Sequence, residues 1–225
     1  MGTRFGFLVI MKGQKSKKGK VVIVSGPSGV GKSTICREVV KRLDDVYLNV
    51  SVTTRPKAES ERDGGDYWFI SKQQFEERID KGELLEYAEV FGNLYGTPKD
   101  KVEQALQAGK TIILEIDVQG AKQAKAVYPD AVMIFILAPT QKTLAERMGS
   151  RGRDEAEAAE ERLEGAGTEI AAAWQYYEHM VINDDLEQAV GEVVEIIRGK
   201  GHQDIKISGY QGRGESMGTS DGGKE

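Results

Sequence analysis

A short glycine-rich stretch near the N-terminus constrains this 225-residue chain more than any other feature. It follows the β-branched run Val21–Val24 and has the pattern G-x-x-x-x-G-K-S from Gly26 to Ser33. The next segment, Ile35–Leu43, has the apolar spacing of an amphipathic helix. This order predicts a strand, a loop and a helix, with the N–H groups of the loop surrounding a phosphate chain at the N-terminus of the helix.

Two side chains of this loop suit a nucleoside triphosphate. Lys32 would reach the β- and γ-phosphates, and the Ser33 hydroxyl would ligate Mg²⁺. The alternative is a glycine-rich turn that binds nothing, and the strand and helix on either side of the motif argue against it. The predicted triphosphate-binding residues are Gly26, Pro27, Ser28, Gly29, Val30, Gly31, Lys32, Ser33 and Thr34.

Charge and cysteine content narrow the class of protein. The net charge of −5 and the pI near 5.3 disfavour a broad nucleic-acid-binding face, because phosphate backbones require a basic one. Cys36 is the only cysteine, which excludes an internal disulfide, and we expect it to be buried on the first helix. With 39% hydrophobic and 30% charged residues, the composition suits one α/β domain.

Both ends of the chain are expected to be disordered. In residues 1–19 an apolar run at 5–11 precedes a cluster of lysines. The run is too short to cross a bilayer. A signal peptide has its charges before the apolar run, and here that order is reversed. Met11 is a candidate start. Residues 199–225 are rich in glycine and poor in large apolar side chains. We therefore expect a cytoplasmic protein without a membrane partner, and no protein partner is indicated.

The segment from 51 to 98 has short strands and polar loops in the middle of a strand–helix pattern. This predicts a small sheet-rich module inserted into the core. The expected elements are strands at 47–54, 67–70 and 84–90 and a helix at 72–81 capped by Ser71.

A later apolar strand, at 110–117, ends in acidic residues. The carboxyl end of a buried parallel strand faces the nucleotide in such folds, so we expect Asp117 to join Ser33 at the metal. The alternative is an aspartate that only caps a turn. Further strands are predicted at 131–137 and 181–183, and helices at 99–108, 120–127, 140–148 and 186–197.

Seven motifs in their order resemble the guanylate kinase family, from about Lys20 to Gly199. They are G-P-S-G-x-G-K-S-T at Gly26–Thr34, V-S-x-T-T-R at Val50–Arg55, D-G-x-D-Y-x-F at Asp63–Phe69, E-x-A-x-x-x-G-N-x-Y-G-T at Glu86–Thr97, I-L-x-I-D-x-Q-G at Ile113–Gly120, R-x-x-x-R-G at Arg147–Gly152 and V-I-N-D-D-L at Val181–Leu186. The resemblance implies ATP-dependent phosphorylation of GMP, or dGMP, by Mg²⁺-assisted in-line transfer.

The resemblance also implies an architecture and a set of site residues. The fold would be a P-loop-type parallel sheet flanked by helices, spanning 20–198, with a core at 20–50, 99–139 and 168–198, a GMP-binding module at 51–98 and a helical lid at 140–167. By motif position Ser51, Glu86, Thr97 and Asp117 would hold guanine, Arg55, Tyr67 and Tyr95 the acceptor phosphate, Lys32, Arg147, Arg151 and Arg162 the transferring group, and Asn183 the adenine side of ATP.

The chemistry of guanine agrees with this assignment. Guanine presents N1–H and N2–H₂ as neighbouring donors, so the Glu86 carboxylate can accept both, and the Ser51 hydroxyl can donate to O6. Adenine has an acceptor at N1 that would leave the carboxylate unpaired, and mismatches of this kind discriminate strongly. Each assigned residue also has an ordinary alternative: a loop arginine, a solvated carboxylate, a packed aromatic ring or a solvated helix face.

The chain departs from the family pattern at one position. The arginine of T-T-R starts the common family pattern R-x-P-R-x-G-E, in which a second arginine stands three residues later. Here Ala58 occupies the position of that second arginine. Lys57 or Arg62 would be the substitute cation, but lysine lacks the bidentate fork of arginine. We therefore expect a weaker grip on GMP than a two-arginine clamp gives.

Two other functions remain open at this stage. A non-catalytic module that binds a protein or phosphopeptide through the monophosphate site would be expected to have a degraded phosphate loop, whereas this loop is intact. A kinase for another acceptor, such as ribose 1,5-bisphosphate, would have no need of Ser51, Glu86 and Asp117 together, although fold similarity alone does not fix a substrate.

Overall fold

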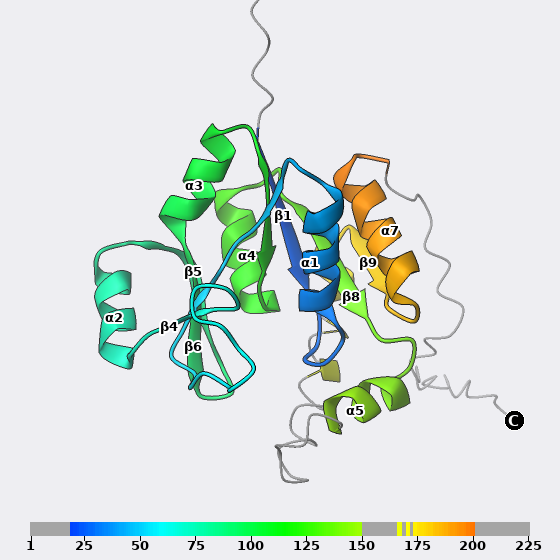
Figure 1. Ribbon diagram of the computed structural model, residues 1–225, viewed down its shortest axis with the longest axis horizontal. Helices are drawn as coiled ribbons and strands as arrows, with labels where there is room; N and C mark the ends of the chain where they lie inside the picture. The colour runs from blue at the N-terminus through cyan, green and yellow to red at the C-terminus, as the bar shows by residue number, and fades with distance from the viewer. Residues whose placement is uncertain (1–18, 150–165, 168–169, 172, 201–225) are drawn as a thin grey trace, which may run out of the picture.

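The computed structural model describes residues 19–149, 166–167, 170–171 and 173–200 (Figure 1). A five-stranded sheet, in which every neighbouring pair is parallel, runs through the middle of this part of the chain. In spatial order its strands are β2 (Val46–Leu48), β7 (Thr111–Glu115), β1 (Lys20–Ser25), β8 (Val132–Leu137) and β9 (His179–Ile182). The predicted parallel α/β class is confirmed.

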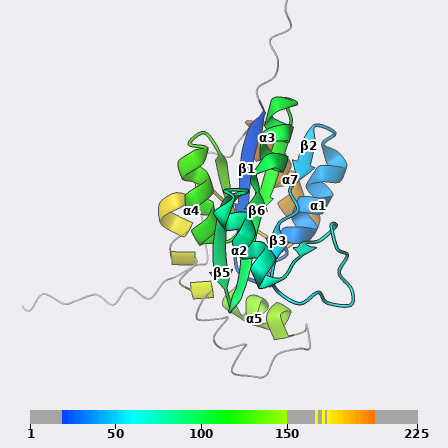
Figure 2. The ribbon, with the colours of Figure 1, turned by 90° about the vertical axis from the view of Figure 1, so that its left-hand side faces the viewer.

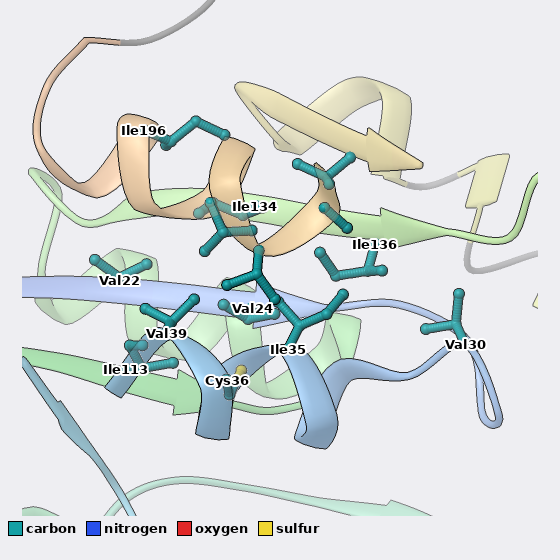
Figure 3. Close-up of a cluster of buried hydrophobic side chains, with 14 of the residues drawn as sticks. Val22, Val24, Val30, Ile35, Cys36, Val39, Ile113, Ile134, Ile136 and Ile196 are labelled. Atoms are coloured by element: carbon teal, nitrogen blue, oxygen red, sulfur yellow. The ribbon is translucent and has the colours of Figure 1, made fainter. Parts of the chain in front are cut away.

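Helices cover both faces of the parallel sheet because the strands are apolar on both sides. Val22 and Val24 of β1 point toward α1 (Lys32–Arg42) and α7 (Leu186–Ile197), where Cys36 is fully buried as expected (Figure 3). Val21 and Ile23 point the other way, toward α3 (Lys99–Gln107) and α4 (Val118–Val127). A strand that is buried on both faces has a near-continuous β-branched sequence, and this explains the run in β1.

A second, four-stranded sheet lies beside the first (Figures 1 and 2). Its spatial order is β4 (Trp68–Phe69), β3 (Val52–Thr53), β6 (Asn93–Pro98) and β5 (Leu84–Val90), with β3 and β4 parallel and the other pairs antiparallel. Helix α2 (Lys72–Asp80) begins with the predicted Ser71 cap, whose side chain accepts from the Gln74 N–H in a capping box.

The structure divides the segment that we expected to form one strand at 47–54. Strand β2 pairs with β7 in the parallel sheet, and the Asn49 N–H still donates to the Ile113 carbonyl at 2.9 Å. The chain then leaves this sheet, and Val52 pairs with Gly96 in the second one. Alternation of apolar residues predicts extended backbone but does not say which sheet a strand joins.

Helix α5 (Gln141–Gly149) starts the segment expected to form a lid. Most of that segment, most of the predicted leader and most of the predicted tail lie outside the described residues. Within the described ranges no helix combines the length and the apolar character needed to cross a membrane.

Candidate active site

The phosphate loop connects β1 to α1 at the carboxyl edge of the parallel sheet. The Lys32 ammonium donates to the carbonyl oxygens of Gly26 and Pro27, at 2.5 and 2.9 Å, and so lies over the loop. Gly31 is the N-cap residue of α1, with φ 101°, and it has no side chain that could cap the first N–H groups. Free N–H groups at a helix N-terminus favour an anion, so this geometry suits the phosphates of a nucleotide.

Asn183 packs against the loop from the end of β9. Its Nδ2 donates to the Val30 carbonyl at 2.8 Å, and a Cβ at Gly31 would collide with this same amide. The Arg147 guanidinium of α5 donates to the Asn183 carbonyl oxygen at 2.9 Å. The sequence suggested Asn183 as a contact of adenine and Arg147 as a phosphate ligand; here Asn183 braces the loop and Arg147 is joined to it.

We expect the change Asn183→Ala to weaken ATP binding without affecting the acceptor. It would leave the buried Val30 carbonyl without its amide donor, which costs about 1–3 kcal/mol. This cost would lower the stability of the protein or shift the phosphate loop. Steady-state kinetics should show a severalfold rise in the KM for ATP and little change in the KM for the acceptor. The control is Asn93→Ala, which removes a side chain that donates to the Phe91 carbonyl of its own turn at 3.1 Å. Equal KM changes for both substrates in Asn183→Ala would contradict the role.

The carboxylate at Ser33 is Glu115, not Asp117. The Ser33 Oγ donates to Glu115 Oε1 at 2.6 Å, and Glu115 is the last residue of β7. Asp117 lies beyond the strand end, where it caps α4 by accepting from the Gly120 N–H at 2.9 Å. Sequence reasoning missed Glu115, although an acidic side chain two residues before Asp117 was a visible signal.

A row of polar side chains crosses the second sheet. Glu86 of β5 pairs with Thr97 of β6, and the register of β3 with β6 puts Ser51 opposite Thr97. Directly opposed residues on antiparallel strands point to the same face, so these three side chains share one. All three are buried, which is unusual for polar residues of a small surface sheet.

Helix α4 closes the row at the Glu86 end. A Cβ at Gly120 would overlap the Glu86 carboxylate, and the Gln123 side chain holds β5 by donating to the Tyr87 carbonyl at 2.8 Å. Burial raises the pKa of Glu86 to about 7, and the nearby Asp117 carboxylate adds to this. A carboxyl group that is 3% exposed and has a raised pKa suggests a role in binding.

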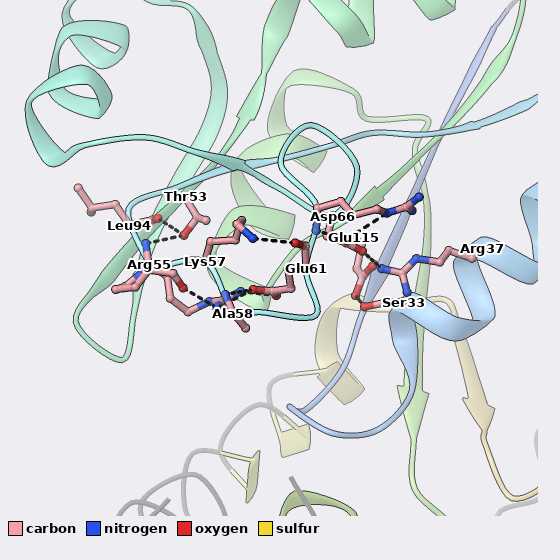
Figure 4. A network of polar contacts seen from close by, with 12 residues as sticks. Ser33, Arg37, Thr53, Arg55, Lys57, Ala58, Glu61, Asp66, Leu94 and Glu115 are labelled. Carbon is pink, nitrogen blue, oxygen red and sulfur yellow. Dashed lines mark hydrogen bonds and ion pairs between the residues drawn. The ribbon is translucent and has the colours of Figure 1, made fainter. Parts of the chain in front are cut away.

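The three residues expected to bind the acceptor phosphate lie close together. The Tyr67 and Tyr95 rings lie 5.8 Å apart, and the Arg55 guanidinium lies 5.6 Å from the centre of the Tyr67 ring. Burial raises the pKa of Tyr67 well above its ordinary value, so its phenol stays a neutral hydrogen-bond donor. Arg55 also forms a bidentate ion pair with Glu61, which the sequence did not single out (Figure 4).

The loop that carries this cluster is tied to α1 by an ion pair. Asp66 accepts from the Arg37 guanidinium and from the Arg62 N–H, the latter at 2.8 Å (Figure 4). This contact brings the Tyr67 end of the loop next to the helix that begins at the phosphate loop. The other two expected lid ligands, Arg151 and Arg162, lie outside the described residues.

The comparisons with known proteins agree with this geometry. A family model described as guanylate kinase matches residues 18–200. The chain is 47% identical over 180 residues to the guanylate kinase of Carboxydothermus hydrogenoformans, covering 80% of this chain and 88% of the relative, and 48% identical over 178 residues to that of Gloeobacter violaceus, covering 79% and 86%. The crystal structure of guanylate kinase from Anaplasma phagocytophilum superposes with a TM-score of 0.69 at 30% identity, over 84% of this chain and 89% of that one. The chain belongs to the guanylate kinase family.

Proposed function

We propose that this protein transfers the γ-phosphoryl group of ATP to GMP, and to dGMP as well. The observation that carries the proposal is the buried Glu86 carboxylate, in one row with Ser51 and Thr97 and next to Asp117. Glu86 accepts from N1–H and N2–H₂ of guanine, Ser51 donates to O6, and Thr97 and Asp117 complete the site. These contacts are to the base rather than to the ribose 2′ position, which is why the proposal includes dGMP.

The acceptor phosphate would bind one step along the same sheet. Thr53 and Tyr95 form the next pair on the same face of β3 and β6, and Arg55 lies two residues after the end of β3. An arginine fork with two phenol donors, Tyr67 and Tyr95, suits a phosphate monoester. The base and the phosphate would thus be held by two rows of one rigid sheet.

The donor side would be the phosphate loop. The Lys32 ammonium would exchange the loop carbonyls for the β- and γ-phosphates, and Asn183 would act through the Val30 carbonyl rather than by touching adenine. Arg147, with Arg151 and Arg162, would close over the transferring group in an in-line transfer. Positioning and charge neutralisation are what phosphoryl transfer requires of the protein.

The residues at Ser33 fit a magnesium ion. A hydroxyl and a carboxylate oxygen 2.6 Å apart are hard oxygen ligands, of the kind that Mg²⁺ shares with nucleotide phosphates. We propose that Ser33 and Glu115 hold the ion, in place of the expected pair Ser33 and Asp117. When bound, the metal neutralises charge on the phosphate oxygens.

Calorimetric titration with GMP and IMP tests the base contacts. IMP lacks the 2-amino group, so one Glu86 hydrogen bond is lost and the affinity should fall about 10- to 100-fold, as expected for a hydrogen bond to a charged group. AMP should bind more weakly than either. Equal affinity for GMP and IMP would contradict the role of Glu86.

Restoring the missing arginine is expected to strengthen acceptor binding. The Ala58 N–H donates to Glu61 Oε2 at 2.8 Å, so position 58 lies beside the Arg55 ion pair. Ala58→Arg should lower the Kd for GMP severalfold to about tenfold, and Ala58→Lys should do less, because lysine lacks the fork. Calorimetry showing no change in either variant would mean that Ala58 does not mark a lost contact.

A further inference from the structure

The loop between β3 and β4 contains a carboxylate that the proposed mechanism does not use. Glu61 Oε2 accepts from Arg55 Nη1 at 3.1 Å, and Glu61 Oε1 accepts from Arg55 Nη2 at 2.7 Å. Burial favours the neutral acid, but the hydrogen bonds from Arg55 and from the Ala58 N–H outweigh it and hold the pKa of Glu61 below its ordinary range. The pair is therefore ionised at neutral pH.

Glu61 is fixed by its own turn, independently of Arg55. Its N–H donates to the Ala58 carbonyl at 3.0 Å, its carboxylate accepts from the Ala58 N–H at 2.8 Å, and its carbonyl accepts from the Lys57 ammonium at 3.1 Å (Figure 4). A side chain that merely filled the phosphate site until a ligand displaced it would have no reason to be anchored in this way. The anchoring makes Glu61 a fixed support.

The hydrogen bonds from Arg55 to Glu61 and Pro56 all use the Nη atoms of the guanidinium. Glu61 engages the Nη1 and Nη2 ends of the guanidinium, and Nη1 also donates to the Pro56 carbonyl at 3.0 Å. The Nε edge is on the other side of the group. The hydrogen bond to Glu61 raises the pKa of Arg55 most, and the Tyr95 phenol raises it further through its charge and a side-chain hydrogen bond.

We propose that Glu61 is a positioning residue, which holds the Arg55 guanidinium by its Nη ends so that the Nε edge meets the phosphate of GMP. The inference rests on the proposed function. Because Ala58 stands at the second arginine position, Arg55 supplies the bidentate contact alone, and its orientation matters more than it would in a two-arginine clamp. Without Glu61, the Arg55 side chain would be free to rotate before GMP binds and would lose that rotamer freedom on binding.

Kinetics of Glu61→Ala test this role. The KM for GMP should rise about tenfold, while kcat and the KM for ATP stay within about twofold, because Arg55 is released and nothing at the phosphate loop changes. Glu61→Gln keeps one oxygen acceptor and should recover part of the loss. Glu59→Ala, which removes an exposed carboxylate of the same loop, is the matched control and should behave as the unmodified protein.

A double-mutant cycle with Arg55→Ala separates positioning from other roles. In the Arg55→Ala background, Glu61→Ala should leave the KM for GMP unchanged or lower it, because the remaining carboxylate only repels the phosphate. The same tenfold rise in that background would overturn the inference, as would a lower KM in the single variant, which would make Glu61 a competitor of GMP. If the unmodified protein did not turn over GMP, the proposed function would fail and this inference with it; turnover of GMP with an unchanged KM in Glu61→Ala would overturn the inference alone.

Discussion

Replacing Lys32 with alanine is expected to lower kcat by about 10²- to 10³-fold, with the fold unchanged. The ammonium donates to two carbonyl oxygens of the phosphate loop, those of Gly26 and Pro27. In the proposed complex the ammonium faces the charge that develops on the transferring phosphate, and loss of one such group in a water-excluded site costs about 3–4 kcal/mol. The measurement is kcat from release of ADP at saturating ATP and GMP.

Lys41→Ala is the matched control for this variant. Lys41 lies in the last turn of the same helix and pairs with Glu38 at 2.6 Å on an exposed surface, so its loss should change kcat by less than about twofold. Near-normal kcat in the Lys32→Ala protein would contradict the assignment of the phosphate loop to the donor nucleotide. Similar thermal unfolding of both variants would show that the lost activity is not lost structure.

Replacing Glu86 with glutamine is expected to impair the reaction and stabilise the free protein. The amide presents an N–H₂ to the base where two acceptors are needed, so kcat/KM for GMP should fall by about 10² or more. Burial raises the pKa of this group from an ordinary 4.5 to about 7. The folded state thus binds the proton more tightly than the unfolded state, and the free energy of unfolding falls as pH rises through this interval.

The stability effect has a definite sign and pH window. Below pH 4.5 the carboxyl is neutral in both states, and above pH 7 the folded protein carries a buried charge that costs about 3 kcal/mol, because each tenfold change in a protonation equilibrium corresponds to about 1.4 kcal/mol. The difference in unfolding free energy between Glu86→Gln and the unmodified protein should therefore grow by about 2–3 kcal/mol from pH 5 to pH 8. Glu89→Gln, on an exposed position of the same strand, should show no such growth.

The same pKa predicts how GMP binding depends on pH. Only the ionised Glu86 accepts both guanine donors, so the Kd for GMP should be constant above about pH 8 and weaken about fourfold by pH 6.5. Two results together would show that Glu86 is not the buried acid described here. One is a Kd for GMP that does not change over this pH range, and the other is a difference in unfolding free energy between Glu86→Gln and the unmodified protein that is the same at pH 5 and pH 8.

Much of the donor site could be predicted because its signals are local in sequence. The loop from Gly26 to Ser33 lies between one strand and one helix, and the backbone geometry of that connection fixes where its N–H groups point. The base-binding row was predicted only through family resemblance. Ser51, Glu86 and Thr97 come from three different segments of the second sheet, and nothing in their local sequence says that the strands pair in that register.

The missed features depend on where elements end and on contacts within loops. Glu115 and Asp117 are two residues apart and looked interchangeable, but β7 ends at Glu115, so that Asp117 becomes the cap of α4. The bidentate pair of Arg55 with Glu61 depends on the turn from Ala58 to Glu61, which polar composition alone does not define. Side-chain partners across such a turn follow from its backbone, and that was not predictable here.

The central claim is that this protein phosphorylates GMP selectively, and an ADP-release assay with ATP and Mg²⁺ tests it most directly. GMP, dGMP, AMP and ribose 1,5-bisphosphate would be compared as acceptors, with Lys32→Ala as the control. We predict turnover with GMP and dGMP and loss of the signal in the control. Turnover with AMP and with ribose 1,5-bisphosphate should be lower by a factor of about one hundred or more, as expected when buried polar groups are left unpaired. Equal turnover with ribose 1,5-bisphosphate, or none with any acceptor in a folded protein, would contradict the account.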